Sequence, residues 1–280
     1  MPRGRAATEG RRVPVLAFLL AVLLAPLAAR AETIAVPLDY QGRQIELSGS
    51  LDKPSGAGPF PMVILLHGCD GNNPCALGRS VAWARLLHAE GYATLILDSF
   101  TARSYSSGVC GNARMVSAEE RARDVYAAAL ILSARPDIGA DRIAVMGFSH
   151  GGWTVLDAAS ANREELAPWR DKLKGHGKLV AFVAFYPNCA KTEHDDFLGP
   201  VFVLVGDKDG LSPYATSERS AKRSRAGAAE FRLKVYPGAV HDFDYERASG
   251  VLRGTPLAYD ADAAADARVQ VADFLRPYLK

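Results

Sequence analysis

Short, nearly uninterrupted apolar segments alternate with longer amphipathic ones from Pro61 to the C-terminus. Continuous apolar segments are typical of strands buried on both faces, and their alternation with helical segments favours a parallel sheet covered by helices on both sides. Polar and apolar residues alternate instead between residues 33 and 54, which indicates an antiparallel hairpin before that sheet. With that hairpin we expect about seven or eight strands. The predicted buried strands are residues 62–68, 92–99, 141–148, 178–187, 201–207 and 231–238.

Helices are predicted from their period and their capping residues. Ser117 and Glu120 have the spacing of a capping box, which should open a helix that ends near Ala134. A final helix is expected from about Asp260 to Leu275. Residues 102–115 and 162–177 have no clear period and are predicted to be long loops. No repeat or linker interrupts residues 32–280, so we expect one domain without a large cap.

The first residues have the pattern of a secretory signal peptide. Four arginines precede an apolar segment over 13–29, and Ala29-Arg30-Ala31 has the small residues of a cleavage site. The apolar segment falls short of the roughly 20 residues that cross a bilayer, so a cleaved signal (1–31) is favoured over a retained anchor. The pair Arg11-Arg12 leaves twin-arginine export open beside the general secretory route. We predict a periplasmic or secreted protein that has no membrane contact after cleavage.

Charge and cysteine content support this reading. Removal of residues 1–31 takes away five arginines and one glutamate, so the formal charge of +2 becomes about −2. No basic stripe remains that would suggest a nucleic-acid partner. The four cysteines, Cys69, Cys75, Cys110 and Cys189, suit an oxidising compartment and allow as many as two disulfides. Their spacing lacks the second close pair that zinc sites use, so we predict no metal site. The chemistry of the candidate residues described below requires no cofactor either.

A pentapeptide with the G-x-S-x-G pattern indicates nucleophilic chemistry. Gly147-Phe148-Ser149-His150-Gly151 follows a predicted strand and opens a predicted helix. A serine in so sharp a turn is expected to have strained backbone angles, and the residues two before and two after it must be very small. A glycine-rich turn with an incidental serine would give the same pattern. The remaining candidates must decide between the two readings.

Asp209 and His241 follow Ser149 in the order Ser, Asp, His, which is the order of α/β-hydrolases. A serine hydroxyl needs a histidine to take its proton, and a carboxylate must orient that histidine and stabilise its charged form. All three residues come after predicted parallel strands, where open α/β sheets place their sites. Asp207 competes for the acid role, but we favour Asp209 and expect Asp207 to cap the turn.

Attack by Ser149 would create an oxyanion that needs two backbone N–H donors. One should come from His150, which follows the nucleophile, and the other from the loop after an earlier strand. In that loop Cys69 follows His67-Gly68, and Gly68 lets the backbone turn its amide toward the site.

Five short segments together resemble the dienelactone-hydrolase-like branch of the α/β-hydrolase superfamily, over about Ile34 to the C-terminus. The segments are His67-Gly68-Cys69-Asp70-Gly71, Asp98-Ser99-Phe100, Gly147-Phe148-Ser149-His150-Gly151-Gly152, Gly206 with Asp209 and Pro213, and Val240-His241-Asp242-Phe243. The resemblance implies an α/β-hydrolase fold and a small ester or lactone as substrate. The namesake enzymes use a cysteine nucleophile where this chain has Ser149, which favours ester hydrolysis. The resemblance also suggests Arg103 and Arg114 as counterparts of the family's substrate-binding arginines.

The other candidates concern the pocket and the disulfides. Phe148, Trp153 and Phe243 lie near the triad in sequence and are candidates for pocket walls, although core packing explains them equally well. Two disulfides are expected rather than one. Cys69 with Cys110 is a plausible pair, and Cys75 could take either partner.

Two other functions remain open. A peptidase related to the prolyl-oligopeptidase catalytic domain would use the same triad, although such enzymes usually carry a propeller domain for which this chain has no room. A catalytically silent periplasmic binding protein would have no need to keep all three triad residues.

Overall fold

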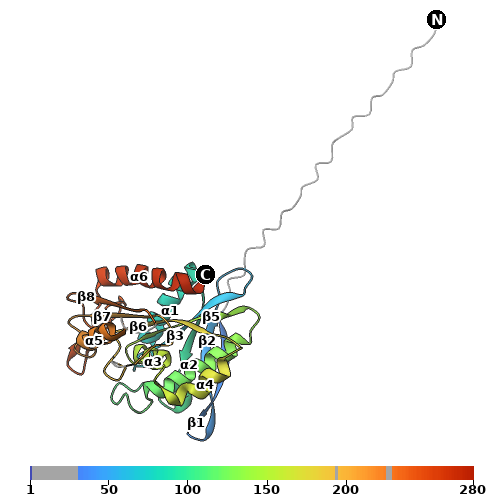
Figure 1. Cartoon of the computed structure of the whole chain (residues 1–280). Helices are drawn as coiled ribbons and strands as arrows, with labels where there is room; N and C mark the ends of the chain where they lie inside the picture. Colours follow the sequence, from blue (N-terminus) through green and yellow to red (C-terminus); the bar gives the residue numbers. More distant parts are fainter. Residues whose placement is uncertain (2–30, 193–194, 225–228) are drawn as a thin grey trace.

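The computed structural model describes residue 1 and residues 31–192, 195–224 and 229–280. Within them, an eight-stranded sheet in the order β1-β2-β4-β3-β5-β6-β7-β8 forms the centre of the molecule (Figure 1). Its strands are β1 (Glu32–Tyr40), β2 (Arg43–Asp52), β3 (Phe60–Leu66), β4 (Ala93–Asp98), β5 (Ile138–Phe148), β6 (Leu179–Phe185), β7 (Val201–Gly206) and β8 (Phe231–Tyr236). The α-helices are α1 (Pro74–Ala89), α2 (Ala118–Ser133), α3 (His150–Ala159), α4 (Ala167–Leu173), α5 (Tyr214–Ser224) and α6 (Ala261–Leu279).

The sheet is mostly parallel, as the sequence predicts. Strands β3 to β8 run in one direction, while β1 and β2 form an antiparallel hairpin and β2 pairs antiparallel with β4. Each predicted strand is present with its ends displaced by no more than a few residues. The structure therefore confirms the α/β-hydrolase type of architecture without a large cap.

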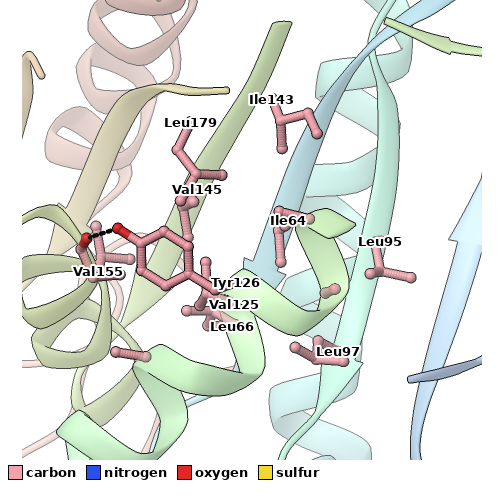
Figure 2. Close-up of a cluster of buried hydrophobic side chains, with 14 of the residues drawn as sticks. Ile64, Leu66, Leu95, Leu97, Val125, Tyr126, Ile143, Val145, Val155 and Leu179 are labelled. Atoms are coloured by element: carbon pink, nitrogen blue, oxygen red, sulfur yellow. Dashed lines mark hydrogen bonds between the residues drawn. The ribbon is translucent and has the colours of Figure 1, made fainter. Parts of the chain in front are cut away.

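Each central strand contributes to two separate cores, because successive side chains point to opposite faces of a sheet. In β3, Ile64 and Leu66 pack with Val125 of α2 and Val155 of α3 on one face (Figure 2). Val63 and Leu65 pack on the other face with residues of α1 and α6. All four β3 side chains are fully buried. Burial on both faces is why the strand sequences show continuous apolarity rather than alternation.

Helix α2 begins as its sequence predicts. The Ser117 side chain accepts from the Glu120 amide at 3.1 Å, and the Glu120 side chain accepts from the Ser117 amide at 2.8 Å, which completes the capping box. The Tyr126 hydroxyl donates to the Ala158 carbonyl at 2.8 Å and joins α2 to α3 inside the core (Figure 2). Helix α6 is also capped at its predicted start, by Asp260, but continues four residues beyond the expected end at Leu275.

The prediction of a long loop over 162–177 is wrong. This segment contains a 3₁₀ turn, η2 (Glu164–Leu166), followed by α4. Helix α4 spans only two turns, and Pro168 lies in its first turn, so it shows no recognisable period. The segment over 102–115 is mostly turns, with the 3₁₀ turn η1 (Thr101–Arg103) at its start. A hairpin of two-residue strands, β9 (Val251–Leu252) and β10 (Thr255–Pro256), was not predicted, because strands so short carry no pattern.

Strand pairing brings the carboxyl ends of the parallel strands to one edge of the sheet. Leu66 lies beside Gly147, Phe148 beside Phe185, and Gly206 beside Tyr236. The loops after β3, β5, β7 and β8 therefore all leave the sheet at this edge. These loops, together with His150 at the start of α3, hold every residue predicted for the triad and the oxyanion hole.

The predicted signal peptide falls almost entirely on residues 2–30, which lie outside the described residues. Its cleavage after Ala31 stays a prediction. In the described part of the chain, no helix combines the length and the apolarity needed to cross a bilayer.

Candidate active site

Ser149 occupies a strained turn between β5 and α3. Its backbone angles are φ 53° and ψ −114°, in a region that residues other than glycine seldom adopt and that costs about 1–3 kcal/mol. The turn is held on both sides, because the Ser149 amide donates to the Phe185 carbonyl at 3.0 Å and its carbonyl accepts from the Trp153 amide at 2.9 Å. The expectation of a strained serine is confirmed. An incidental serine in a relaxed glycine-rich turn does not fit these angles.

The glycines of the turn are required by close backbone contacts. A Cβ on Gly147 would lie closer than 3.0 Å to the Gly151 carbonyl, and a Cβ on Gly151 would lie equally close to the carbonyls of Leu66 and His67. No rotation of a side chain could relieve either clash. The strand, the turn and the helix can approach one another only because both positions lack a side chain.

Asp209 and His241 are in direct contact. Asp209 Oδ2 lies 2.7 Å from His241 Nδ1, and both side chains are buried. The other carboxylate oxygen, Oδ1, accepts from the amides of Leu211 and Ser212 at 2.8 and 3.0 Å, so the carboxylate has a fixed orientation. Asp207 instead accepts from the Gly238 amide at 2.7 Å and joins the loops after β7 and β8. Of the two competing aspartates, Asp209 is the one that bonds to His241.

The bond to Asp209 determines which nitrogen of His241 can accept a proton. When Nδ1 carries the hydrogen that is donated to the carboxylate, Nε2 keeps its lone pair. Nε2 is buried and has no hydrogen-bond partner among the described residues. His241 and Ser149 line the same cavity. The arrangement can therefore supply a base beside the serine hydroxyl.

A buried hydrogen-bond network lies against the His241 ring. The Tyr186 ring lies 4.5 Å from the His241 ring between centroids, and its hydroxyl donates to Asp244 at 2.6 Å. Trp83 Nε1 also donates to Asp244, at 2.8 Å, and Arg79 pairs with Asp242 at 2.9 Å. Burial raises the pKa of Asp244 above its usual range.

The sequence did not single out these supporting residues for a role in positioning His241. The only available signal was the aspartate that recurs two residues after Asp242 in His241-Asp242-Phe243-Asp244. Tyr186 also has a positive φ, 38°, which no motif in the sequence predicts.

The loop after β3 lies against the nucleophile turn, as the oxyanion prediction requires. A Cβ on Gly68 would lie 3.6 Å from Ser149 Cβ, so the two backbones are in close contact here. His150 is the first residue of α3, where an amide has no partner within the helix. These placements suit the amides of Cys69 and His150 as donors, and the oxyanion hole stays a prediction.

Two buried histidines, His67 in this loop and His150 at the start of α3, stay uncharged. His67 Nδ1 bonds to the Gly68 carbonyl at 2.8 Å, and the His67 Nε2 atom accepts from the Ser99 amide at 3.2 Å. His150 contacts Arg121 through Nδ1 at 2.7 Å and the Ala113 carbonyl through Nε2 at 3.0 Å. Burial, followed by the Arg121 charge, lowers the pKa of both histidines to about 3. Burial also lowers the pKa of Arg121 to about 9.

One disulfide, Cys69–Cys110, joins the β3 loop to the loop after β4. The pair is the one that the sequence suggested, but the expectation of a second disulfide is wrong. Cys75 lies in the first turn of α1, whereas Cys189 is fully buried 3.2 Å from the Ser217 hydroxyl. Cys75 and Cys189 do not bond to each other, although both follow strands that end at the same edge of the sheet. Among the described residues, no group of acidic, histidine or cysteine side chains is suited to hold a metal ion.

Two cavities meet at Ser149. One of about 140 Å³ is lined by His150, Trp153 and Leu211 beside the serine. The second, of about 260 Å³, is lined by His241 together with Asp70, Asn73, Arg79 and Asp242. Four residues border both cavities: Ser149, Leu252 and the two cysteines of the disulfide.

Several predicted pocket residues lie elsewhere. Arg103 is buried in a two-pronged ion pair with Asp124 at 2.7 and 2.9 Å, so it is unable to reach a substrate. Arg114 is exposed and lines neither cavity. Phe148 and Phe243 belong to the core between the sheet and α6. Of the predicted aromatic residues, Trp153 does line a cavity.

A different arginine reaches the cavity rim. Arg253 lies at the turn between β9 and β10, lines the smaller cavity, and donates to the carbonyls of Cys110 and Gly111 at 2.8 and 3.1 Å. The hairpin thereby bonds to the disulfide-linked loop. No pattern in the sequence identified Arg253, because its partners are backbone atoms about 140 residues away.

Comparison with known proteins places this geometry in context. A curated relative from Synechocystis, named putative carboxymethylenebutenolidase, is 23% identical over 251 residues, which cover 85% of this chain and 94% of that protein. The crystal structure of a putative dienelactone hydrolase from Klebsiella pneumoniae has a TM-score of 0.66 at 22% identity and covers 89% of this chain and 99% of its own. Thermogutta terrifontis esterase 2, solved phosphorylated by paraoxon, has a TM-score of 0.63 at 16% identity and covers 87% and 92%.

The similarities to solved structures show the fold alone, whereas the match to a family sequence profile shows the family. The sequence profile of the dienelactone hydrolase family matches residues 47–279, which include the strained serine, the Asp209–His241 contact and the loop after β3. This chain belongs to the dienelactone hydrolase family.

Proposed function

We propose that the protein hydrolyses carboxylic esters or lactones through a catalytic triad of Ser149, His241 and Asp209. The observation that carries the proposal is the 2.7 Å contact between Asp209 Oδ2 and His241 Nδ1. This contact leaves Nε2 without a hydrogen-bond partner in the part of the chain that the structure describes, and His241 lines a cavity that Ser149 also lines. Membership of a hydrolase family and the strained turn at Ser149 support the same reading.

The first half of the reaction forms an acyl-enzyme. His241 Nε2 takes the proton of the Ser149 hydroxyl while the serine oxygen bonds to the carbonyl carbon of the substrate. The bond between that carbon and the leaving oxygen then breaks, and His241 returns the proton to the leaving alcohol. Asp209 keeps Nδ1 protonated and stabilises the charged imidazole between the two transfers.

The second half uses water in place of the alcohol. His241 takes a proton from a water molecule whose oxygen bonds to the acyl carbon, and the Ser149 oxygen leaves and recovers that proton. In both halves the negative oxygen would be held by the amides of Cys69 and His150, which begins α3 at the positive end of the helix dipole. These steps balance without a metal ion or cofactor.

We place this chemistry in the periplasm or outside the cell. The Cys69–Cys110 disulfide supports this location, because such bonds persist mainly in oxidising compartments. Cleavage after Ala31 would leave Glu32, the first residue of β1, at the mature N-terminus. The mass of protein recovered from the periplasm or medium tests this, and a chain that retains residues 1–31 would contradict it.

Turnover and covalent labelling test the triad together. We expect the mature protein to hydrolyse p-nitrophenyl acetate and butyrate, and Ser149→Ala to lower kcat by at least about a thousandfold. A fluorophosphonate should modify one peptide, the one that contains Ser149. Equal activity in both proteins, or a labelled peptide elsewhere, would refute the assignment.

The alternatives give different results in the same experiment. A prolyl-oligopeptidase-type peptidase would be labelled at Ser149 but would cleave aminoacyl p-nitroanilides faster than the esters. A silent binding protein would neither turn over nor be labelled.

A further inference from the structure

We propose that the two cavities divide the substrate between them: the smaller one takes a short acyl group, and the larger one takes a leaving alcohol that is neutral or cationic. This inference rests on the proposed function, because it assigns parts of the ester to the two sides of Ser149. It narrows the substrate class to esters of compact acids with alcohols that carry no negative charge.

The position of His241 decides which cavity holds the leaving group. In the acylation step, His241 Nε2 delivers a proton to the leaving oxygen, so that oxygen must lie on the histidine side of the serine. His241 lines the larger cavity and not the smaller one. The alcohol therefore occupies the larger cavity, and the acyl group extends into the cavity beside His150 and Trp153.

The size of the acyl cavity limits the acid. Its volume is about 140 Å³, and its walls include Trp153, Leu211 and Ala113. An apolar cavity of about 150 Å³ accommodates one benzene molecule. An acyl chain of about six carbons would fill the space, and longer chains would have to leave it.

The charge of the larger cavity limits the alcohol. Asp70, Asp242 and Arg79 line it, and Arg79 is paired with Asp242 at 2.9 Å. Asp70 has no ion pair within bonding distance among the described residues, and Arg79, whose charge also acts on Asp70, is shared with Asp242 and Asp244 at 2.9 and 3.9 Å. Burial raises the pKa of Asp70 and outweighs the opposing charge of Arg79. A carboxylate on the leaving alcohol would be repelled here.

The side walls keep the two groups apart. The Cys69–Cys110 disulfide and Leu252 border both cavities at Ser149. A substrate reaching the serine must therefore place one arm on each side of this boundary. Variants in one cavity should change selectivity for one arm only.

The test is a crossed design with two substrate series. The acyl series is p-nitrophenyl acetate, butyrate, hexanoate, octanoate and decanoate. The alcohol series consists of three acetates: acetylcholine, its neutral isostere 3,3-dimethylbutyl acetate, and the anionic 4-acetoxybutanoate. Their hydrolysis is measured by pH-stat titration. Each series varies one arm of the substrate while the other arm stays small or constant.

We expect kcat/KM of the unmodified protein to fall beyond the hexanoate and to be lowest for the anionic acetate. Trp153→Ala should extend the chain-length profile, and Ala113→Leu should shorten it, without changing the ratio between the cationic and anionic acetates. Asp70→Asn should lower that ratio by up to about fivefold and leave the chain-length profile unchanged. Asp171→Asn, which removes an exposed carboxylate on α4, is the matched control and should change neither.

Each outcome bears on a different claim. Fastest turnover of the anionic acetate, or an altered alcohol preference in Trp153→Ala, would overturn the division while leaving the triad intact. Loss of turnover for every ester together with absence of fluorophosphonate labelling at Ser149 would instead overturn the proposed function, and the division with it.

Discussion

Asp207 and Asp209 lie two residues apart after β7, but they bond to different partners. Asp209 bonds to the His241 ring, whereas Asp207 bonds to the backbone amide of Gly238. An asparagine at 207 would keep an oxygen that accepts from this amide. An asparagine at 209 would instead offer a donor to Nδ1 and favour the wrong histidine tautomer. The two positions therefore form a matched pair for testing the acid role.

We predict that Asp209→Asn lowers kcat for p-nitrophenyl butyrate by about ten thousandfold, while Asp207→Asn lowers it by less than about tenfold. Steady-state kinetics and thermal unfolding of both variants provide the measurement. A comparable loss of activity in the two variants, at similar unfolding temperatures, would contradict the assignment of Asp209.

Residues of the candidate site were predictable where a local motif and chain order agreed. Ser149 and His241 have both signals, and Asp209 needed only a choice between neighbours. Arg103 was assigned wrongly because its partner, Asp124, lies on another element and nothing in the sequence joins the two. Tyr186 escaped notice as a support for His241 because its role depends on a ring contact across the site rather than on sequence spacing.

At the scale of elements, the loop after β3 is stabilised at several points. The disulfide joins it to the loop after β4, the Val109 amide donates to the Cys69 carbonyl at 2.6 Å, and Arg253 bonds to the far side of the disulfide. If this loop supplies an oxyanion donor, as we propose, such preorganisation would favour the reaction. Its geometry should therefore depend on the disulfide.

We predict that Cys110→Ser, or reduction with dithiothreitol, lowers both stability and kcat without preventing fluorophosphonate labelling. A cross-link across 41 residues stabilises the folded state by about 4 kcal/mol in the chain-entropy account. Urea unfolding and ester turnover, with and without reductant, provide the measurement. Cys75→Ser is the control, because Cys75 is a thiol outside the disulfide. Unchanged stability and turnover after verified reduction would contradict the role of the bond.

Elements were predictable when they were long enough to show a period. The buried strands and α2 were identified from apolar runs and a capping box, both of which act within a few residues. Helix α4 and the β9–β10 hairpin were missed because two turns, or two residues per strand, carry no periodic signal. Since the missed hairpin carries Leu252 and Arg253, the site was less predictable from the sequence than the fold.

For the whole molecule, the buried histidines link stability to pH. The pKa of His67 and of His150 is lowered to about 3, chiefly by burial, against about 6.5 in an unfolded chain. Between these values the unfolded chain binds more protons than the folded one, so acid favours unfolding. The contribution of these two histidines to stability is lost as the pH falls below about 6.5, and the loss continues down to about 3, whereas the pKa of Asp157, raised to about 7 by burial, gives a contribution of the opposite sign.

We predict that the free energy of unfolding decreases by about 2 kcal/mol for each buried histidine between pH 7 and pH 5. Urea unfolding at the two pH values measures it. His150→Asn should remove one such contribution, whereas His176→Asn, at an exposed position, should retain the full pH dependence. An unaltered pH dependence in His150→Asn would show that other groups carry the effect.

The boundary formed by the disulfide and Leu252 should affect the hydrolysis of open-chain esters and of cyclic esters differently. Under the proposed division, an ester would release its alcohol from the larger cavity and leave room there for the incoming water. A lactone would keep its new hydroxyl tethered to the acyl chain, so that this hydroxyl would still lie near His241 when water must enter. Ring closure would then compete with hydrolysis on every turnover. The same site would thus commit open-chain esters to product but process lactones reversibly, with the tether length setting the balance.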